Sequence, residues 1–160
     1  MKLGLIADTH DHLDPRIAGL FEGVRHILHA GDVGQPDLIG ELELVAPVTV
    51  VAGNNDFHPT WRETEIRDLF GHRFLVEHIV HPLGPSPAFR RRLQQSEARI
   101  VVYGHSHRPF HRTIDGVLYL NPGSAGAPRY GLPATVCLLH FDAGVPRPEF
   151  LTLDRHPFVP

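Results

Sequence analysis

The sequence lacks several features that define common classes of protein. Cys137 is the only cysteine among 160 residues, which excludes an internal disulfide framework and a cysteine-ligated metal site. We expect its thiol to be an inert core group. No apolar run approaches the roughly 20 residues of a membrane-spanning helix, and the stretch after Met1 has a strand pattern instead of a signal peptide. We therefore expect a cytoplasmic protein that has no membrane partner.

A large charge of one sign is also lacking. The formal net charge is only −3, and the chain has no long basic tract, which argues against nucleic acid as a partner. Histidine, by contrast, is abundant, with 13 residues beside 15 lysines and arginines together. Imidazole is the commonest nitrogen ligand for metals in proteins. The positions of the histidines therefore bear directly on function.

Five short apolar runs have the length of strands. Largely uninterrupted runs of this kind are typical of strands that are covered on both faces. They occupy residues 2–8, 26–32, 48–54, 74–78 and 99–105. Helical spacing is found between them, at 14–24, 36–45 and 87–97, with Asp14 expected as the N-cap of the first helix and Pro15 as its first residue.

The C-terminal part changes character. Residues 110–120 have the pattern of a hairpin around Asp115 and Gly116, and further short strands are expected at 135–141 and 149–154. We therefore predict an α/β fold in which two packed β layers carry helices on the outside. The length suits a single domain over residues 1–160.

Polar residues follow the ends of the five N-terminal strands. In α/β sheets, ligands gather beyond the carboxyl ends of the strands, so these side chains should meet at one edge. Gly31, Gly53 and Gly104 lie just ahead of them, where a tight turn or a close approach of backbone is needed. The candidate residues are Asp8, His10, Asp32, Asn54, Asp56, His78, His105 and His107.

The segment "VVYGHSHRP" places two histidines one residue apart. Residues i and i+2 of an extended chain share a face, so His105 and His107 could converge on one point. Each candidate also has an ordinary explanation on its own, because Asp8 or Asp32 could be a cap and Asn54 a turn residue. Their occurrence at five strand ends favours a functional site.

The motifs "DTHD", "GD", "GNND" and "GHSH", with a strand that ends on a histidine, resemble the calcineurin-like metallophosphoesterase superfamily. The likeness is greatest to its small single-domain bacterial and archaeal phosphodiesterases, and "NPGSAGAPR" at 121–129 is similar to them as well. The resemblance implies a four-layer sandwich of two mixed sheets flanked by helices. It also implies two metal ions, one held by Asp8, His10 and His107, the other by Asn54, His78 and His105, with Asp32 bridging both.

The donor types agree with that implication. Carboxylates, neutral imidazoles and an amide oxygen suit borderline divalent ions, and we expect Mn, with Fe, Zn or Ni as alternatives. Two ions about 3.5 to 4 Å apart can hold a bridging hydroxide and clamp the attacking and leaving oxygens at phosphorus. The expected function is hydrolysis of a small or nucleotide-like phosphoester by a phosphodiesterase or phosphatase, with Asp32, Asn54 and Asp56 as catalytic residues.

One position departs from the larger members of the family. These carry a histidine after the Gly-Asn pair, placed to protonate the leaving group, where this sequence has Asn55. An amide is not an acid, and Asp56 then has no histidine to orient. Either His12, His58 or a metal-bound water substitutes, or the enzyme prefers good leaving groups. Roles of His81 and Arg129 at the site also stay open.

A non-catalytic alternative follows from the same resemblance. The fold occurs in a retromer scaffold subunit, where it acts as a protein-interaction module with little or no catalysis. The complete set of seven expected ligands, His10 included, favours the enzyme. The sequence does not indicate an oligomeric state.

Overall fold

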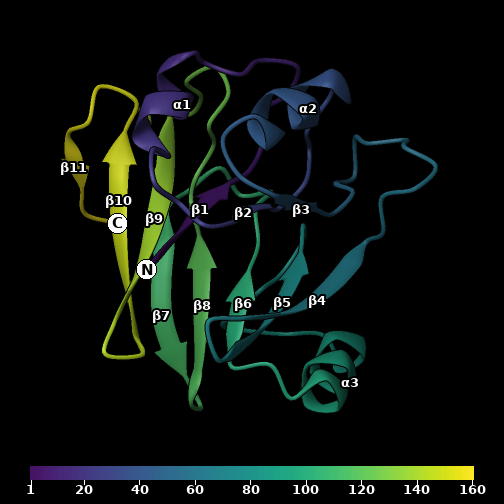
Figure 1. Ribbon diagram of the computed structural model, residues 1–160. Helices are drawn as coiled ribbons and strands as arrows, with labels where there is room; N and C mark the ends of the chain where they lie inside the picture. Colours follow the sequence, from purple (N-terminus) through teal and green to yellow (C-terminus); the bar gives the residue numbers. More distant parts are fainter.

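Two β-sheets pack face to face in the structure, a computed structural model that describes residues 1–160 (Figure 1). The first sheet has the order β11-β10-β9-β1-β2-β3, in which β1, β2 and β3 are parallel and the other pairs antiparallel. Its strands are β1 (Lys2–Ile6), β2 (Ile27–His29), β3 (Val48–Val50), β9 (Thr135–Asp142), β10 (Val145–Thr152) and β11 (Pro157–Phe158). The predicted mixed sheet is confirmed here.

The second sheet has the order β4-β5-β6-β8-β7 and is also mixed. The central pairs β5–β6 and β6–β8 are parallel, whereas the outer pairs are antiparallel. Its strands are β4 (Thr64–Leu69), β5 (His72–Glu77), β6 (Ile100–Val102), β7 (Phe110–Ile114) and β8 (Val117–Asn121). The hairpin between β7 and β8 turns at Asp115 and Gly116, with φ of 50° and 77°, which is the conformation that a two-residue hairpin loop requires.

Three helices cover the outer faces of the sheets. Helix α1 (Arg16–Leu20) is shorter than the predicted 14–24, and its N-cap is Pro15 instead of the expected Asp14. Asp14 Oδ1 accepts a hydrogen bond from Arg16 N at 2.9 Å. Helices α2 (Asp37–Glu43) and α3 (Pro87–Ser96) match their predicted segments closely. The side chain of Ser86 caps α3 by accepting from Phe89 N. None of the three has the length and apolar character that a membrane-spanning helix needs.

Three hydrophobic cores separate four layers. The first lies between α1, α2 and the first sheet, and Gly4 of β1 belongs to its floor because a Cβ there would press on the ring of Phe21. The second fills the space between the sheets, where Leu5 and Leu139 meet Phe74 and Val102. The third packs Phe89 of α3 against the second sheet. The predicted four-layer sandwich is therefore confirmed.

Cys137 is fully buried within the second core, as expected. Burial raises the pKa of its thiol well above the ordinary range. A thiolate is therefore not available for metal binding or redox chemistry at this position.

Candidate metal centre

The candidate ligands lie in loops at one edge of the two sheets, beyond the carboxyl ends of β1, β2, β3, β5 and β6. Their backbone is unusual, because left-handed φ values are uncommon for residues other than glycine. Such strain collects at functional sites, where the surrounding structure enforces it. Five of the seven expected ligands have φ between 45° and 67°, namely Asp8, His10, Asp32, His105 and His107.

Asp8, His10 and His107 form one group. Asp8 Oδ1 lies 3.3 Å from His107 Nε2 and 3.8 Å from His10 Nε2, and the two imidazole Nε2 atoms are 3.3 Å apart. Asp8 is completely buried, whereas His10 is partly exposed. These three side chains are close enough to share one ion, and they are the three that the family resemblance assigns to one ion.

Asp8, Asp32 and His78 form a second group. His78 Nε2 lies 3.4 Å from Asp32 Oδ2 and 3.8 Å from Asp8 Oδ1. Asp8 is thus common to both groups, whereas the resemblance gives the bridging position to Asp32. Asp32 Oδ2 is also 3.7 Å from His10 Nε2. Both carboxylates therefore lie between His10 and His78.

Asn54 and His105 complete the edge. The Asn54 Oδ1 atom and His105 Nδ1 are 3.0 Å apart, and the ring of His105 lies edge-on to that of His78 with centroids 5.3 Å apart. Both Asn54 and His105 are exposed. The structure therefore brings all seven expected ligands to one place.

Buried polar atoms without partners show that the site suits a cation. His78 Nδ1 lies 2.7 Å from the carbonyl oxygen of Ala30, so it carries the ring proton and leaves a lone pair on Nε2. That Nε2 and Asp8 Oδ1 are both buried, and neither has a hydrogen-bond partner; the same is true of His107 Nδ1. Two acceptors that face each other in the interior are costly unless a positive charge joins them. A divalent ion satisfies this requirement.

The surroundings of Asp32 keep its carboxylate ionised. Burial alone raises the pKa of Asp32, but the nearby His78 imidazole and the two hydrogen bonds from Asn55 outweigh it and hold the pKa well below the ordinary value. Burial likewise lowers the pKa of His78, whereas its contact with Asp32 and the charge of Asp8 raise it overall. Burial and the nearby His78 lower the pKa of His105. An anionic Asp32 is the form that binds a metal ion.

Comparison with known proteins shows which family the chain belongs to. The family model described as "Calcineurin-like phosphoesterase superfamily domain" matches residues 1–144. The chain belongs to this superfamily. It is 35% identical over 148 residues to a probable metallophosphoesterase of Methanothermobacter thermautotrophicus, covering 86% of this chain and 85% of the relative. It is 31% identical over 156 residues to a phosphodiesterase of Methanocaldococcus jannaschii, covering 83% and 89%.

A solved structure shows the same phosphoesterase fold. The chain superposes on a Vps29 single mutant from Entamoeba histolytica with a TM-score of 0.78, covering 95% of this chain and 92% of that one. The sequence identity is only 23%, so this likeness concerns the fold alone.

Glycines allow the phosphoesterase loops to close around the two carboxylates. A Cβ at Gly53 would overlap the backbone nitrogen and the carboxylate of Asp32. A Cβ at Gly104 would come within 2.9 Å of Asp8 Oδ2. At Gly31, φ is 91° and a Cβ would meet both Gly53 and His78. The predicted need for close backbone approach at these three glycines is confirmed.

Asp56 has a different position from that of the metal ligands. Its carboxylate accepts hydrogen bonds from the backbone nitrogens of Val33, Gly34 and Gly53, at 3.1, 3.1 and 2.8 Å. The side chain thereby ties the loop after β2 to the loop after β3. It thereby fixes the backbone of the residues next to Asp32 and Asn54.

His29 is a supporting residue that no sequence pattern revealed. It is fully buried, its Nδ1 accepts a hydrogen bond from Gly31 N at 3.2 Å, and its Nε2 is 3.0 Å from Thr9 Oγ1. Since the Thr9 hydroxyl donates to Val33 O at 2.9 Å, it must accept from His29 Nε2–H. Burial lowers the pKa of His29 to about 4. A neutral His29 therefore joins the Asp8 and Asp32 loops.

The segment that begins at Asn121 supports the two histidines after β6. Asn121 Nδ2 donates to Gly104 O at 2.8 Å and to Ser106 Oγ at 3.0 Å. Ser124 Oγ donates to Asp8 O at 2.9 Å. The sequence signal was present in the "NPGSAGAPR" segment, although it did not indicate which loops these side chains hold.

The remaining sequence candidates lie around the centre or away from it. His58 lines a cavity together with His10 and Asn55, and His12 lines another beside Gly126. His81 and Arg129 are exposed, and neither lines these cavities. Tyr130, which the sequence did not single out, places its ring edge-on to His107 with centroids 5.8 Å apart.

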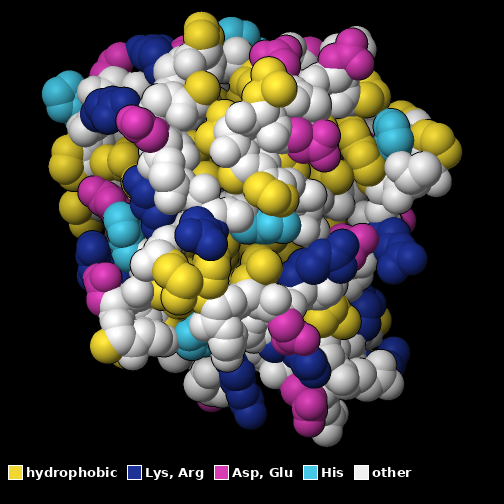
Figure 2. All heavy atoms as spheres, in the orientation of Figure 1, with side chains coloured by type: hydrophobic (Ala, Val, Ile, Leu, Met, Phe, Trp, Pro, Cys, Tyr) yellow, Lys and Arg dark blue, Asp and Glu magenta, His cyan; other side chains and the backbone are white.

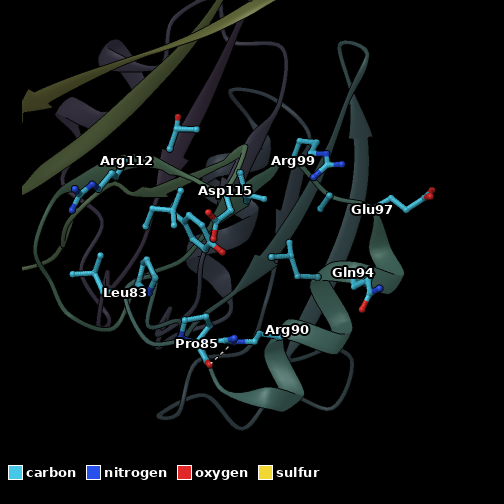
Figure 3. Close-up of a pocket in the computed structure, with 15 residues that line it drawn as sticks. Leu83, Pro85, Arg90, Gln94, Glu97, Arg99, Arg112 and Asp115 are labelled. Carbon is cyan, nitrogen blue, oxygen red and sulfur yellow. Dashed lines mark hydrogen bonds between the residues drawn. The ribbon is translucent and has the colours of Figure 1, made fainter.

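A cavity of about 870 Å³ is separate from the centre. It lies between α3 and the turn of the β7–β8 hairpin, where Arg90, Arg99 and Arg112 surround Asp115 (Figure 3). This is the end of the second sheet at which β6 begins, opposite the edge that carries the ligands (Figure 1). None of the candidate ligands lines it.

Proposed function

We propose that this phosphoesterase holds two divalent ions and hydrolyses small or nucleotide-like phosphodiesters. The expected ion is Mn²⁺, with Fe, Zn or Ni as alternatives. One observation carries the proposal: buried acceptors of Asp8 and His78 face each other 3.8 Å apart with no donor between them. Around them stand three more imidazoles, a second carboxylate and an amide, which is a donor set for borderline ions. The relative from Methanocaldococcus jannaschii that is named a phosphodiesterase supports the reaction class.

The ligand assignment agrees with the first group described above, and for the second ion and the shared carboxylate it follows the family resemblance. Bound ions would supply Lewis-acid activation of the phosphoester and of the attacking water. We assign Asp8, His10 and His107 to one ion and Asn54, His78 and His105 to the other, with Asp32 shared between them.

The remaining chemistry depends on residues of the chain itself. Asp56 and His29 fix the loops through backbone and hydroxyl contacts. Asn55 donates to Asp32 and has no acidic proton to give to a leaving group. We therefore propose that the enzyme acts best on esters whose leaving group departs without protonation.

Metal analysis of the purified protein tests the site. After reconstitution with Mn²⁺ and desalting, the wild type should retain two ions per chain, and Asp32→Asn should retain fewer. Asp115→Asn, an exposed carboxylate beside the separate cavity, is the matched control and should behave as the wild type. Equal retention in all three proteins at less than one ion per chain would end the proposal.

A hydrolysis panel separates the enzyme from the scaffold alternative. Similarity to Vps29 at 23% identity establishes the fold and leaves a protein-interaction module as the second candidate. The Mn²⁺-loaded wild type should hydrolyse nitrophenyl phosphodiesters, and Asp32→Asn should lose at least 100-fold in kcat/KM, in keeping with the loss of a directly participating group. Full metal loading without hydrolysis of any diester or monoester would favour the scaffold.

A further inference from the structure

Three aromatic side chains gather in the loop between β3 and β4, which extends outward from the body of the molecule (Figure 1). Phe57 is 96% exposed. Next to it, the rings of His58 and Trp61 stack with centroids 4.2 Å apart and planes inclined by 19°. Figure 2 shows hydrophobic and histidine side chains together at the outer tip of this loop. We refer to residues 57–61 as the aromatic loop.

The stacked pair is held in place, whereas Phe57 is not. His58 Nδ1 accepts from Thr60 N at 3.4 Å and lies 3.1 Å from Thr60 Oγ1. Trp61 packs against the core under α1 and α2. Phe57 has no such cover. Packing of a second flat apolar surface against an exposed aromatic ring lowers the free energy. The aromatic loop is thus a partly ordered platform with one free ring.

A cavity of about 320 Å³ connects the aromatic loop with the metal centre. Its ten lining residues include Phe57, His58 and Trp61 on the loop, and His10 and Asn55 at the centre. His10 is an expected ligand, and Asn55 holds Asp32. A substituent of a phosphorus bound at the centre would therefore enter this cavity directly.

The charges of the cavity select the kind of substituent. No lysine or arginine lines it, and its ionisable members besides the histidines are Asp11 and Asp56. A second cavity, which Asn54 and His78 line, also contains Glu63 and Glu77. Carboxylates repel a second phosphate, whereas aromatic faces attract any planar base and the Gln35 amide can hydrogen-bond to its edge.

We propose that this cavity binds the nucleobase of a nucleotide phosphodiester, stacked on the aromatic loop with Phe57 closing over it. The proposal rests on the proposed function, because the phosphate at the metal centre fixes where the base lies. It names the substrate class as nucleotide diesters and assigns base recognition to Phe57 and Trp61.

Fluorescence provides a test that does not require turnover. Trp61 is the only tryptophan of the chain, so all tryptophan emission comes from a residue that lines this cavity. Titration with cytidine 5′-monophosphate, excited where the base absorbs little, should give a saturable change, and ribose 5-phosphate at the same concentrations should give none. Phe57→Ala should raise the apparent Kd by about fivefold or more. Leu83→Ala, a 74% exposed residue beside the separate cavity, should not alter it.

A substrate pair tests the same residue in catalysis. The nitrophenyl ester of a nucleoside 5′-monophosphate and methyl nitrophenyl phosphate share one leaving group and differ only in the base-bearing part. Phe57→Ala should lower kcat/KM by about fivefold or more for the first and change the second less than twofold. Equal effects on both substrates, or a wild-type emission change that ribose 5-phosphate reproduces, would overturn the base site. If the wild type hydrolyses neither substrate but shows base-dependent quenching, the base site stands and the proposed hydrolysis fails.

Discussion

Asn55 holds Asp32 by two hydrogen bonds, one to each carboxylate oxygen. The Asn55 backbone nitrogen donates to Asp32 Oδ1 at 2.9 Å, and its side-chain Nδ2 donates to Oδ2 at 2.7 Å. Together with His78, these contacts lower the pKa of Asp32 against the opposing effect of burial. The residue at the position where larger phosphoesterases carry a histidine therefore orients the carboxylate of Asp32.

Asn55→Ala should weaken metal binding without removing a ligand. The backbone donor remains, but Asp32 Oδ2 loses its partner, and loss of a hydrogen bond behind a ligand commonly costs about 10- to 100-fold in metal affinity. Calorimetric titration with Mn²⁺ measures the effect. Gln94→Ala, on the exposed face of α3, is the matched control. Unchanged affinity in Asn55→Ala would show that Asp32 needs only the backbone contact.

Two glycine substitutions should act in opposite directions. Gly53→Ala forces a methyl group into Asp32, so we expect a loss of about 2 kcal/mol or more in the free energy of unfolding together with weaker Mn²⁺ binding. Gly40 lies in α2, and a Cβ there meets nothing within 4 Å. Gly40→Ala should therefore stabilise the protein by about 0.5 to 1 kcal/mol. Urea unfolding compares both with the wild type, and a stable Gly53→Ala would contradict the close approach.

Elements whose conformation depends on a few neighbouring residues could be predicted from the sequence. The hairpin at Asp115 and Gly116 needs two residues that accept positive φ, and the sequence supplies them. Strand β4 was missed because its sequence "TEIRDL" mixes polar residues on both faces and its residues are half-buried or exposed. An edge strand of this kind is determined by its partner β5, which the local pattern does not contain.

Some residues of the candidate site could be predicted from the sequence and others could not. The candidate ligands could be found because each follows a strand end, where the order of motifs is visible in the sequence. His29 and Asn121 could not, because their partners Thr9 and Gly104 are 20 and 17 residues away. Which loop covers a buried side chain depends on the tertiary arrangement.

His29 should make stability depend on pH in the acid range. Its pKa is lowered to about 4 in the folded protein from the ordinary 6.5, so below pH 6.5 the unfolded chain takes up a proton that the folded chain refuses. The contribution is complete above pH 6.5 and decreases as the pH falls to 4, by up to about 3 kcal/mol. His29→Gln should flatten this part of the curve of unfolding free energy against pH, measured with a chelator present. His81→Gln, an exposed control, should not, and parallel curves for wild type and His29→Gln would refute the buried neutral state.

Asn55→His should restore an acid at the position where larger phosphoesterases carry one. An imidazole there can still donate to Asp32, and its second nitrogen could protonate a leaving alkoxide, an effect worth about 10² to 10⁴-fold when the geometry is right. A single substitution rarely reaches that geometry, so we expect a smaller gain, confined to alkyl phosphodiesters, with nitrophenyl esters almost unchanged because nitrophenolate leaves without a proton. The pH profile of kcat/KM should acquire an ionisation near the histidine reference value of about 6.5. Metal content is measured in the same samples, since the new imidazole could capture an ion. An equal change for both ester types at equal metal loading would mean that position 55 faces Asp32 alone and does not reach the leaving group.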